Sequence, residues 1–210
     1  MVTLQLDNLV AAPHAAPVTV RVPAGELAVV VADPATGTAV ARAVAGLATP
    51  LGGRVLVGDR DVTTLPPARR QIGYVPAGAG LLPHLTVRRN IGYGHRRRLR
   101  VRAVADDWVN TVIERLELGL TLEVLPHELS EPQRFRVAVA RAAACLPEVL
   151  VVDLPSGGGG VDRLGDLLVD LAPEDSPGIA TLICSADPVI VDRVDEHRRY
   201  AVERVGSVRR

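Results

Sequence analysis

The sequence predicts an α/β fold, with a largely parallel β-sheet that helices cover on both faces. Three short aliphatic runs carry this prediction, at residues 27–31, 149–152 and 180–184. Their apolar residues are continuous rather than alternating, which is typical of strands buried on both faces. Helical segments separate the runs, and strands that alternate with helices indicate parallel pairing through crossover connections.

The composition predicts one globular domain, or one domain with a subdomain. Of the 210 residues, 48% are hydrophobic and 23% are charged, so the chain can bury a substantial core. Aromatic residues make up only 2%, and the core must therefore consist of Val, Leu and Ala. The formal net charge is zero, which argues against nucleic acid as a partner and against a dominant membrane-surface role.

The first part of the chain is predicted to be rich in β-structure. Residues 2–6 and 18–22 alternate between apolar and polar side chains, as half-buried strands do. The glycine pair at 52–53 leads into a predicted hairpin that runs to residue 60. Another short strand is expected at 72–75.

The second part is predicted to be mostly helical. Residues 86–118 have helical character, most clearly at 105–118. Ser130 fits an N-cap, and Gln133 three residues later completes a capping box before a helix at 132–145. The remaining expected elements are a strand ending at Asp153, a helix at 161–172, the last aliphatic strand, a short helix and an arginine-rich tail.

No signal peptide or membrane-spanning segment is expected. The amino terminus lacks a basic segment followed by an apolar stretch, and no apolar run approaches ~20 residues. Cys145 and Cys184 lie beside apolar segments and share no metal-ligand spacing. Both are predicted to be buried thiols in a reducing cytoplasm, and no metal site is expected.

Residues 29–40 lie where a phosphate-binding loop would lie, after an apolar strand. The loop is expected at 33–39 and a helix at 40–47. A working loop has the pattern G-x-x-x-x-G-K-[ST], whose lysine contacts the phosphates and whose hydroxyl binds Mg²⁺. This chain has no lysine, because all 24 of its basic residues are arginine. The corresponding positions hold Ala32, Gly37, Thr38 and Ala39.

Three longer stretches, at 58–75, 81–94 and 126–142, resemble the nucleotide-binding subunit of ABC transporters, and the pattern is most similar to importers of sugars, oxyanions and metals. The resemblance implies a P-loop NTPase fold of the ABC type, with an antiparallel β subdomain and a helical subdomain. The whole chain, 1–210, would form this domain. The core and β subdomain would take 1–77 and 147–210, and the helical subdomain 78–146.

The chain departs from the family pattern where the family carries its chemistry. The Q-loop glutamine falls on Ala77, the catalytic glutamate on Leu154 and the switch histidine on Ala186. No aromatic residue for stacking on adenine occurs at 9–17. The signature L-S-G-G-Q has become Leu-Ser-Glu-Pro-Gln. The positions that keep the family residue are Gly37, Ser130, Gln133 and Asp153.

These changes predict that no residue is catalytic. Hydrolysis relies on positioning and on neutralising phosphate charge, which Thr38 and Leu154 cannot do. Asp33 and Glu131 place carboxylates near the phosphate positions, and Pro132 removes a backbone donor from the signature helix. No cofactor is therefore expected, and binding of ATP with Mg²⁺ is predicted to be weak or absent.

Several of these residues have a simpler interpretation. Thr36, Gly37, Thr38 and Asp153 form either a residual, weak nucleotide site or a capped turn between a strand and a helix. Ser130, the first of the signature-like residues with Glu131 and Gln133, is most simply an N-cap. The glycines at 157–160 either form an anion-binding nest or a flexible loop. The basic run at 95–102 either binds nucleic acid or lipid, or forms a solvated face.

The resemblance implies a non-hydrolytic structural or regulatory subunit of an ABC transporter. In the family the stretch 81–94 lies near the membrane subunit, and Leu81, Leu82 and His84 are the expected docking residues. The expected partners are a membrane subunit, an intact ABC ATPase subunit, or both, and a dimer is left open. The chain is expected in the cytoplasm, at the inner face of the cell membrane. Two alternatives remain: a working transport ATPase with weak nucleotide binding, and a free-standing interaction protein.

Overall fold

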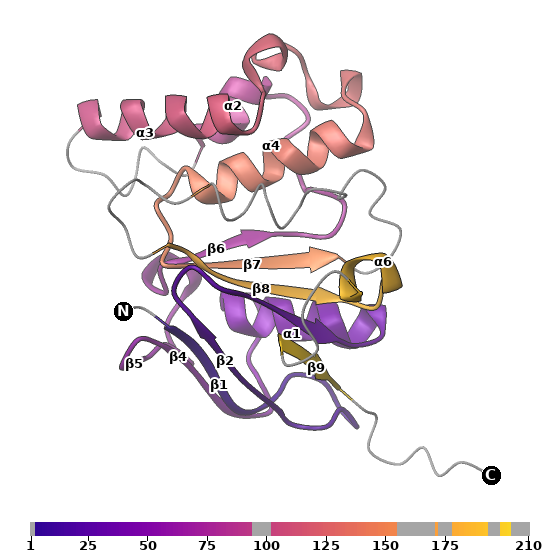
Figure 1. The fold of residues 1–210 in the computed structure, drawn as a ribbon. Coiled ribbons are helices and arrows are strands. Elements are labelled where there is room, and N and C mark those ends of the chain that lie inside the picture. The colour runs from indigo at the N-terminus through magenta and orange to yellow at the C-terminus, as the bar shows by residue number, and fades with distance from the viewer. Residues whose placement is uncertain (1–2, 94–101, 155–170, 172–177, 193–197, 203–210) are drawn as a thin grey trace.

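The computed structural model describes residues 3–93, 102–154, 171, 178–192 and 198–202 (Figure 1). The predicted helix at 161–172, the glycine run, most of the basic run and the arginine-rich tail lie outside the described residues. Within the described part of the chain, no helix has both the length and the apolar character that a membrane crossing requires.

The predicted parallel sheet is confirmed. Its strands, in spatial order, are β6 (Ile72–Val75), β7 (Val149–Leu154), β8 (Ala180–Ser185), β3 (Leu27–Val31) and β9 (Arg199–Ala201). All neighbouring strands pair in parallel. Because the strands are parallel, the segments that follow β3, β6, β7 and β8 all begin at the same edge of the sheet, which we call the carboxyl edge.

Helices cover both faces of this sheet, as the continuous aliphatic runs predicted. Helix α1 (Pro34–Ala45) packs on one face and α4 (Glu131–Ala143) on the other (Figure 1). Alternate residues of β7 belong to two separate cores: Leu150 and Val152 face the helical side, whereas Val149 and Val151 face α1. Every residue of β7 is buried for this reason.

A second, antiparallel sheet closes the α1 side of the molecule. Its spatial order is β2 (Val18–Pro23), β1 (Thr3–Val10), β4 (Gly52–Val57) and β5 (Arg60–Asp61). The alternating side chains of β2 are buried and exposed in turn. The buried ones join the α1-side core, so the predicted β subdomain and its hairpin are confirmed.

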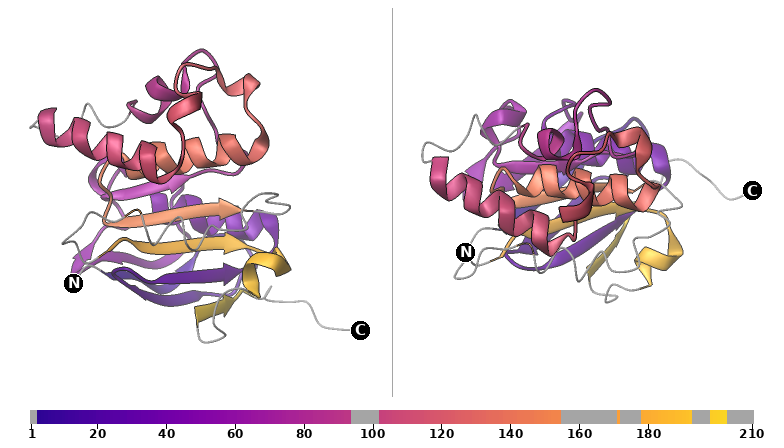
Figure 2. Two further views of the ribbon diagram at one scale, coloured as in Figure 1. Left: turned by 45° about the horizontal axis from the view of Figure 1, so that its top comes forward. Right: turned by 90° about the horizontal axis from the view of Figure 1, so that it is seen from above.

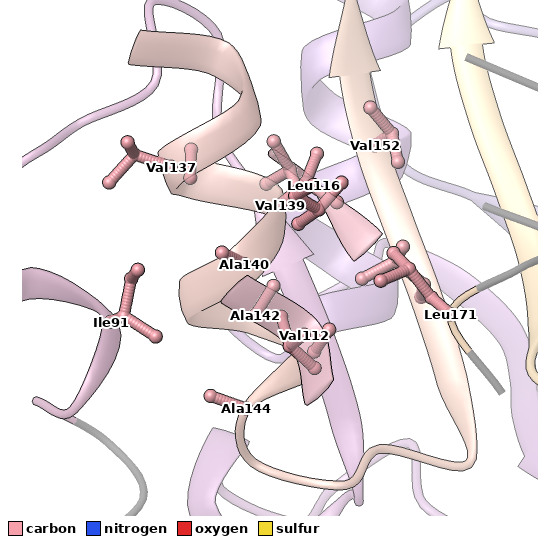
Figure 3. Close-up of a cluster of buried hydrophobic side chains, with 14 of the residues drawn as sticks. Ile91, Val112, Leu116, Val137, Val139, Ala140, Ala142, Ala144, Val152 and Leu171 are labelled. Carbon is pink, nitrogen blue, oxygen red and sulfur yellow. The ribbon is translucent and has the colours of Figure 1, made fainter. Parts of the chain in front are cut away.

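The helical layer on the other side contains α2 (Val87–Ile91), α3 (Arg102–Arg115) and α4 (Figure 2). Their aliphatic side chains interlock over β7, with Val139 facing Val152 and Leu171 (Figure 3). Trp108 is buried there, and its indole N–H donates to the carbonyl of Ala143 at 3.0 Å. The short helix α6 (Pro188–Val191) follows β8.

Two element boundaries and the burial of one cysteine differ from the sequence-based expectation. Helix α1 begins at Pro34 instead of residue 40, because Asp33 caps it and proline fits the first helical position. Residues 86–118 form two helices, α2 and α3, with a break that includes Gly92. The third difference concerns Cys145, which is half-buried because it lines a surface pocket beyond α4, whereas Cys184 is buried as predicted.

Candidate functional site

The carboxyl edge of the parallel sheet brings together most of the positions that the sequence analysis selected. Strand β3 leads into the N-terminus of α1, β6 leads into residues 76–80, and β7 ends at Leu154. Val31 of β3 and Leu154 of β7 both pair with Ser185 of β8. Segments that are far apart in the sequence therefore meet at one edge, where α/β folds bind their ligands.

Asp33 occupies the entrance of α1. Its carboxylate accepts hydrogen bonds from the backbone N–H of Thr36 at 3.3 Å and from the Thr36 hydroxyl at 2.7 Å. The first turn of a helix presents amide donors and a partial positive charge, which is where anions bind. In this structure the anion at that position is a side chain of the protein itself.

Gly37, which keeps the family identity, faces the core. A Cβ added at Gly37 would lie 3.6 Å from the Cβ of Cys184, an ordinary contact distance. The Gly37 amide donates to the carbonyl of Asp33 at 2.8 Å as part of the first helical turn. Both observations agree with the simpler interpretation of residues 36–38 as a capped turn, and the residual nucleotide role stays a prediction.

Thr38 and Asp153 contact each other. The Thr38 hydroxyl donates to one carboxylate oxygen of Asp153 at 3.0 Å, and the Tyr74 hydroxyl donates to the other at 3.2 Å. Asp153 is only 1% exposed. Burial raises its pKa above the ordinary value of 3.8, although the hydrogen bonds from Thr38, Tyr74 and the backbone of Ala77 act in the opposite direction.

Tyr74 was not selected from the sequence. Burial raises the pKa of its phenol, and the neighbouring Asp153 carboxylate adds to this effect. The phenol therefore stays protonated and donates its hydrogen bond. A tyrosine in a short strand is a common packing residue, so only its position opposite Asp153 reveals this role.

The other residues that the sequence analysis assigned to the family's motif positions have apolar side chains. Leu154 is 8% exposed and packs in the helical-side core. Ala77 contributes its backbone N–H to Asp153, and the side chain of Ala39 carries no oxygen. Ala186 is exposed, directly after β8.

The signature-like residues form a capping box at the start of α4, as predicted. The amide of Gln133 donates to the Ser130 hydroxyl at 3.4 Å, and the Ser130 amide donates to the Gln133 side chain at 2.9 Å. Glu131 is exposed in the first helical turn. Ser130 is therefore an N-cap, and a contribution to nucleotide binding stays a prediction.

The segment after β6 is held by α4 through Arg141, another residue that the sequence analysis missed. Its guanidinium donates to the carbonyls of Gly80 at 2.8 Å and Ala79 at 3.0 Å. Gly78, Ala79 and Gly80 all have positive φ angles, so the segment is tightly turned. Burial lowers the pKa of Arg141, but an arginine stays charged at neutral pH.

The expected docking residues follow this turn. Leu81 is half-buried and packs against the helical-side core, while Leu82 is half-buried and His84 is exposed. The backbone of Leu82 is hydrogen-bonded to the side chain of Asn90, a fully buried residue of α2 that the sequence analysis did not select. Docking itself stays a prediction.

The side chains at the carboxyl edge do not match a metal-bound triphosphate. Both carboxylate oxygens of Asp153 accept hydrogen bonds from hydroxyl groups of the protein, and the side chain of Ala39 has no atom that could bind Mg²⁺. The described residues also contain no group of three or more His, Cys, Asp or Glu side chains that could hold a metal ion. We therefore derive no catalytic step through a nucleotide–metal complex.

Comparison with solved structures supports the architecture. CbiO1 from Clostridium perfringens, described as part of the ABC transporter complex cbiONQ, superposes with a TM-score of 0.72 over 95% of this chain and 84% of that one. The two sequences are 17% identical. A likeness at this level of identity shows the fold, which is the predicted ABC-type P-loop NTPase fold.

Curated relatives include a putative 2-aminoethylphosphonate import ATP-binding protein, PhnT, from Salmonella typhimurium. It is 37% identical over 155 residues, which cover 71% of this chain and 42% of the relative. The sulfate/thiosulfate import ATP-binding protein CysA from Mycobacterium tuberculosis is 32% identical over 211 residues, or 98% of this chain and 59% of the relative. The chain thus spans about half the length of the curated relatives it matches.

These relatives overturn one expectation. The sequence analysis expected no cofactor, with ATP and Mg²⁺ weak or absent, but the relatives are named as ATP-binding proteins. The expectation was wrong because, at the loop before α1, it weighed side chains alone. Phosphate groups are also bound by backbone amides at a helix N-terminus, and a substitution that changes only the side chain leaves those amides in place.

The family comparison is the broadest of the three. The model of the family described as "ABC transporter" matches residues 16–157. This range includes the α1 entrance, the turn after β6, residues 81–94, the capping box of α4 and Asp153. The match agrees with the resemblance of the three stretches and with the observed fold. The chain belongs to the ABC transporter family.

Proposed function

We propose that this chain is a non-hydrolytic ATP-binding subunit of an ABC importer, with a structural or regulatory role. One observation carries the proposal: Thr38, at the position of the phosphate-binding lysine, donates its hydroxyl to Asp153 at 3.0 Å. An importer is favoured because the relatives PhnT and CysA are both named as import ATP-binding proteins.

The loss of hydrolysis follows from the groups that remain at the carboxyl edge. Phosphoryl transfer depends on positioning and on stabilising charge in the transition state. Removing one such donor commonly costs about 3 kcal/mol of transition-state stabilisation. Here Thr38 carries no charge, Leu154 packs in an apolar core and Ala186 has no polar group.

ATP is proposed as a ligand rather than as a fuel. Its phosphates would meet the backbone amides at the start of α1, and Asp33 already occupies that entrance. Asp33 must therefore turn away before the phosphates bind. The nucleotide would contribute binding energy to an assembly without being consumed.

The proposed partner is the membrane subunit of the importer, contacted through Leu81, Leu82 and His84 of residues 81–94, which we call the docking segment. An intact ABC ATPase subunit is a further proposed companion. The chain would then lie at the inner face of the membrane. In this proposal, residues 1–77 and 147–210 contain the carboxyl edge where the nucleotide would bind. The helical part, 78–146, contains the docking segment.

The test is to measure binding and turnover on the same purified protein. Calorimetry with ATP should detect binding, and phosphate release should stay below about 0.01 s⁻¹, far under the ~10 s⁻¹ of typical enzymes. A hydrolysing member of the family, purified in the same way, provides the positive control. A reproducible Mg²⁺-dependent rate above this limit would favour a working transport ATPase. Purification from native cells without any membrane or ATPase companion would favour a free-standing interaction protein.

A further inference from the structure

Asn90 is a fully buried polar residue of α2, with 0% of its surface exposed. Asparagine is mostly found at protein surfaces, because burying its amide group is costly unless every polar atom is satisfied. Its neighbours on α2, Val87 and Ile91, are buried as well. The side chain of Asn90 therefore points inward with them, and its hydrogen bonds must be made within the protein.

Those hydrogen bonds go to the turn formed by residues 82–86. The side-chain oxygen Oδ1 of Asn90 accepts a hydrogen bond from the backbone amide of Leu82 at 2.8 Å. Its NH₂ group donates to the carbonyls of Leu82 at 3.1 Å, Leu85 at 2.9 Å and Thr86 at 3.2 Å. A single side chain thus fixes both the start and the end of the turn.

Asparagine suits this position for a chemical reason. The site needs one acceptor and two N–H donors on a short side chain, and an amide provides both. Aspartate would lose the donors and leucine would lose all polar contacts. The turn is also tied to the rest of the helical layer, since the amides of Val87 and Arg88 donate to the carbonyls of Val124 at 3.0 Å and Leu122 at 2.9 Å.

The turn presents a mixed surface. Pro83 and His84 are exposed, and Leu82 and Leu85 are half-buried. Arg89, on the outer side of α2, is exposed and has no salt-bridge partner among the described residues. The exposed Pro83 of the turn and the exposed guanidinium of Arg89 on the adjoining helix complement a protein segment that carries an apolar side chain and a carboxylate.

We infer that Asn90 is a positioning residue, which preforms the 82–86 turn as the docking element for a membrane-embedded protein subunit. The inference rests on the proposed function for the existence of that partner. A loop that is ordered before binding loses less conformational entropy when the partner arrives. Asn90 therefore supports affinity without touching the partner.

The experiment compares the full chain with four single variants and one double variant. Asn90→Asp keeps the acceptor for Leu82 and removes the donors, whereas Asn90→Leu removes both. Asn110→Leu makes the same change at an exposed asparagine of α3 and is the matched control. His84→Ala removes an exposed side chain of the turn, and it is also combined with Asn90→Leu.

Two measurements are made on each protein. Hydrogen exchange reports the amide of Leu82, and sedimentation reports binding to inverted membrane vesicles from the native cells, washed to remove peripheral proteins. Protein-free vesicles of the extracted lipids are the second arm. Circular dichroism and thermal unfolding identify any variant that fails to fold, in which case Asn90→Asp and His84→Ala carry the test.

We expect Asn90→Leu to speed exchange at Leu82 and to weaken vesicle binding by about tenfold or more, since buried unsatisfied groups are left behind. Asn90→Asp should weaken binding while Leu82 stays protected, and Asn110→Leu should change neither. The double variant should bind the vesicles as tightly as whichever of His84→Ala and Asn90→Leu binds them less tightly, because both changes damage the same element.

The inference fails if the wild-type chain binds native vesicles and the folded Asn90 variants bind equally well. Additive losses in the double variant would also overturn it, since Asn90 would then act elsewhere. If the wild-type chain does not bind native vesicles, the proposed docking function and this inference are both overturned. Equal binding to lipid-only vesicles overturns the protein partner and points to a lipid surface.

Discussion

The hydroxyl of Thr38 and the carboxylate of Asp153 are hydrogen-bonded at 3.0 Å although 115 positions separate them in the sequence. The contact joins the first turn of α1 to the end of β7, at the point where an ABC-type site would handle phosphate. A neutral hydroxyl therefore satisfies the buried carboxylate directly. Three testable consequences concern this edge of the sheet, and a fourth concerns Arg70 at the other end of α1.

Replacing Thr38 by valine should lower the free energy of unfolding by about 1–3 kcal/mol, because Asp153 would lose one donor while staying buried. Chemical denaturation of the purified variant measures the change. Thr64→Val provides the control at an exposed threonine and should change stability by less than about 0.5 kcal/mol. Equal effects at both positions would show that the contact contributes nothing specific.

Asp153 should make stability fall as the pH rises. Its folded-state pKa is raised above 3.8, mainly by burial, so the folded state binds the proton more tightly than the unfolded state. The contribution of Asp153 is therefore most favourable below about pH 4 and is lost as the pH rises through the folded pKa. Asp153→Asn removes this titration.

The stability difference between Asp153→Asn and the wild type should accordingly shift in favour of the variant between pH 4 and pH 7. Denaturant unfolding at each pH measures it. Asp59→Asn, at an exposed position, controls for the general change in charge. A difference that stays constant with pH would contradict the raised pKa.

Arg70 should be indispensable for stability. Arg70 is 3% exposed. Its guanidinium donates to four backbone carbonyls, those of Thr63 at 2.6 Å, Leu65 at 2.7 Å, Ala43 at 2.8 Å and Val44 at 2.9 Å. Two of these acceptors belong to the last turn of α1, where a cation is favourable. Arg70→Met should therefore cost about 3 kcal/mol or more, because several buried carbonyls lose their donor.

Thermal and denaturant unfolding check this prediction, and Arg69→Met, one residue earlier and exposed, is the matched control. Arg70→Lys should recover only part of the lost stability. The lysine ammonium group keeps the positive charge, but it donates fewer hydrogen bonds and in a different geometry. An Arg70→Met protein as stable as the Arg69→Met control would refute the structural role.

Asp33→Ser should strengthen ATP binding. Serine still caps α1, but the negative charge that meets the phosphates is removed. Two like charges about 4 Å apart near a protein surface repel by about 4 kcal/mol, so even a screened effect should tighten the dissociation constant by about tenfold or more. Calorimetry with ATP measures the change, and Asp59→Ser is the control. Unchanged affinity would place the phosphates away from the start of α1.

Much of the fold was predictable from local patterns. The run at 149–152 predicted a strand covered on both faces because all its side chains are aliphatic, and alternate residues indeed enter the two cores. Ser130 and Gln133 predicted their own capping box, since both partners lie within one helical turn. The start of α1 was missed, although Asp33 followed by Pro34 is itself a helix-start signal.

The candidate site was predictable only in part. The sequence analysis placed the substitutions at 38, 39, 77, 154 and 186 by the spacing of the family pattern, and this placement stays a prediction. The roles of Tyr74, Arg141 and Asn90 could not, since tyrosine, arginine and asparagine are ordinary residues for a strand or a helix. Their partners lie on other elements, or in a turn whose shape only the folded chain defines.

The sequence by itself determined the fold class, the aliphatic core, the absence of lysine from residues 29–40 and the carboxylate at Asp33. These features depend on residue type and near-neighbour spacing, which are local. Tertiary structure alone decided that Thr38 bonds to Asp153, that Asn90 is buried and that Leu154 enters the core. Parallel pairing brings the ends of β3, β6 and β7 to one edge, and burial then makes each unpaired polar group costly enough to require a partner.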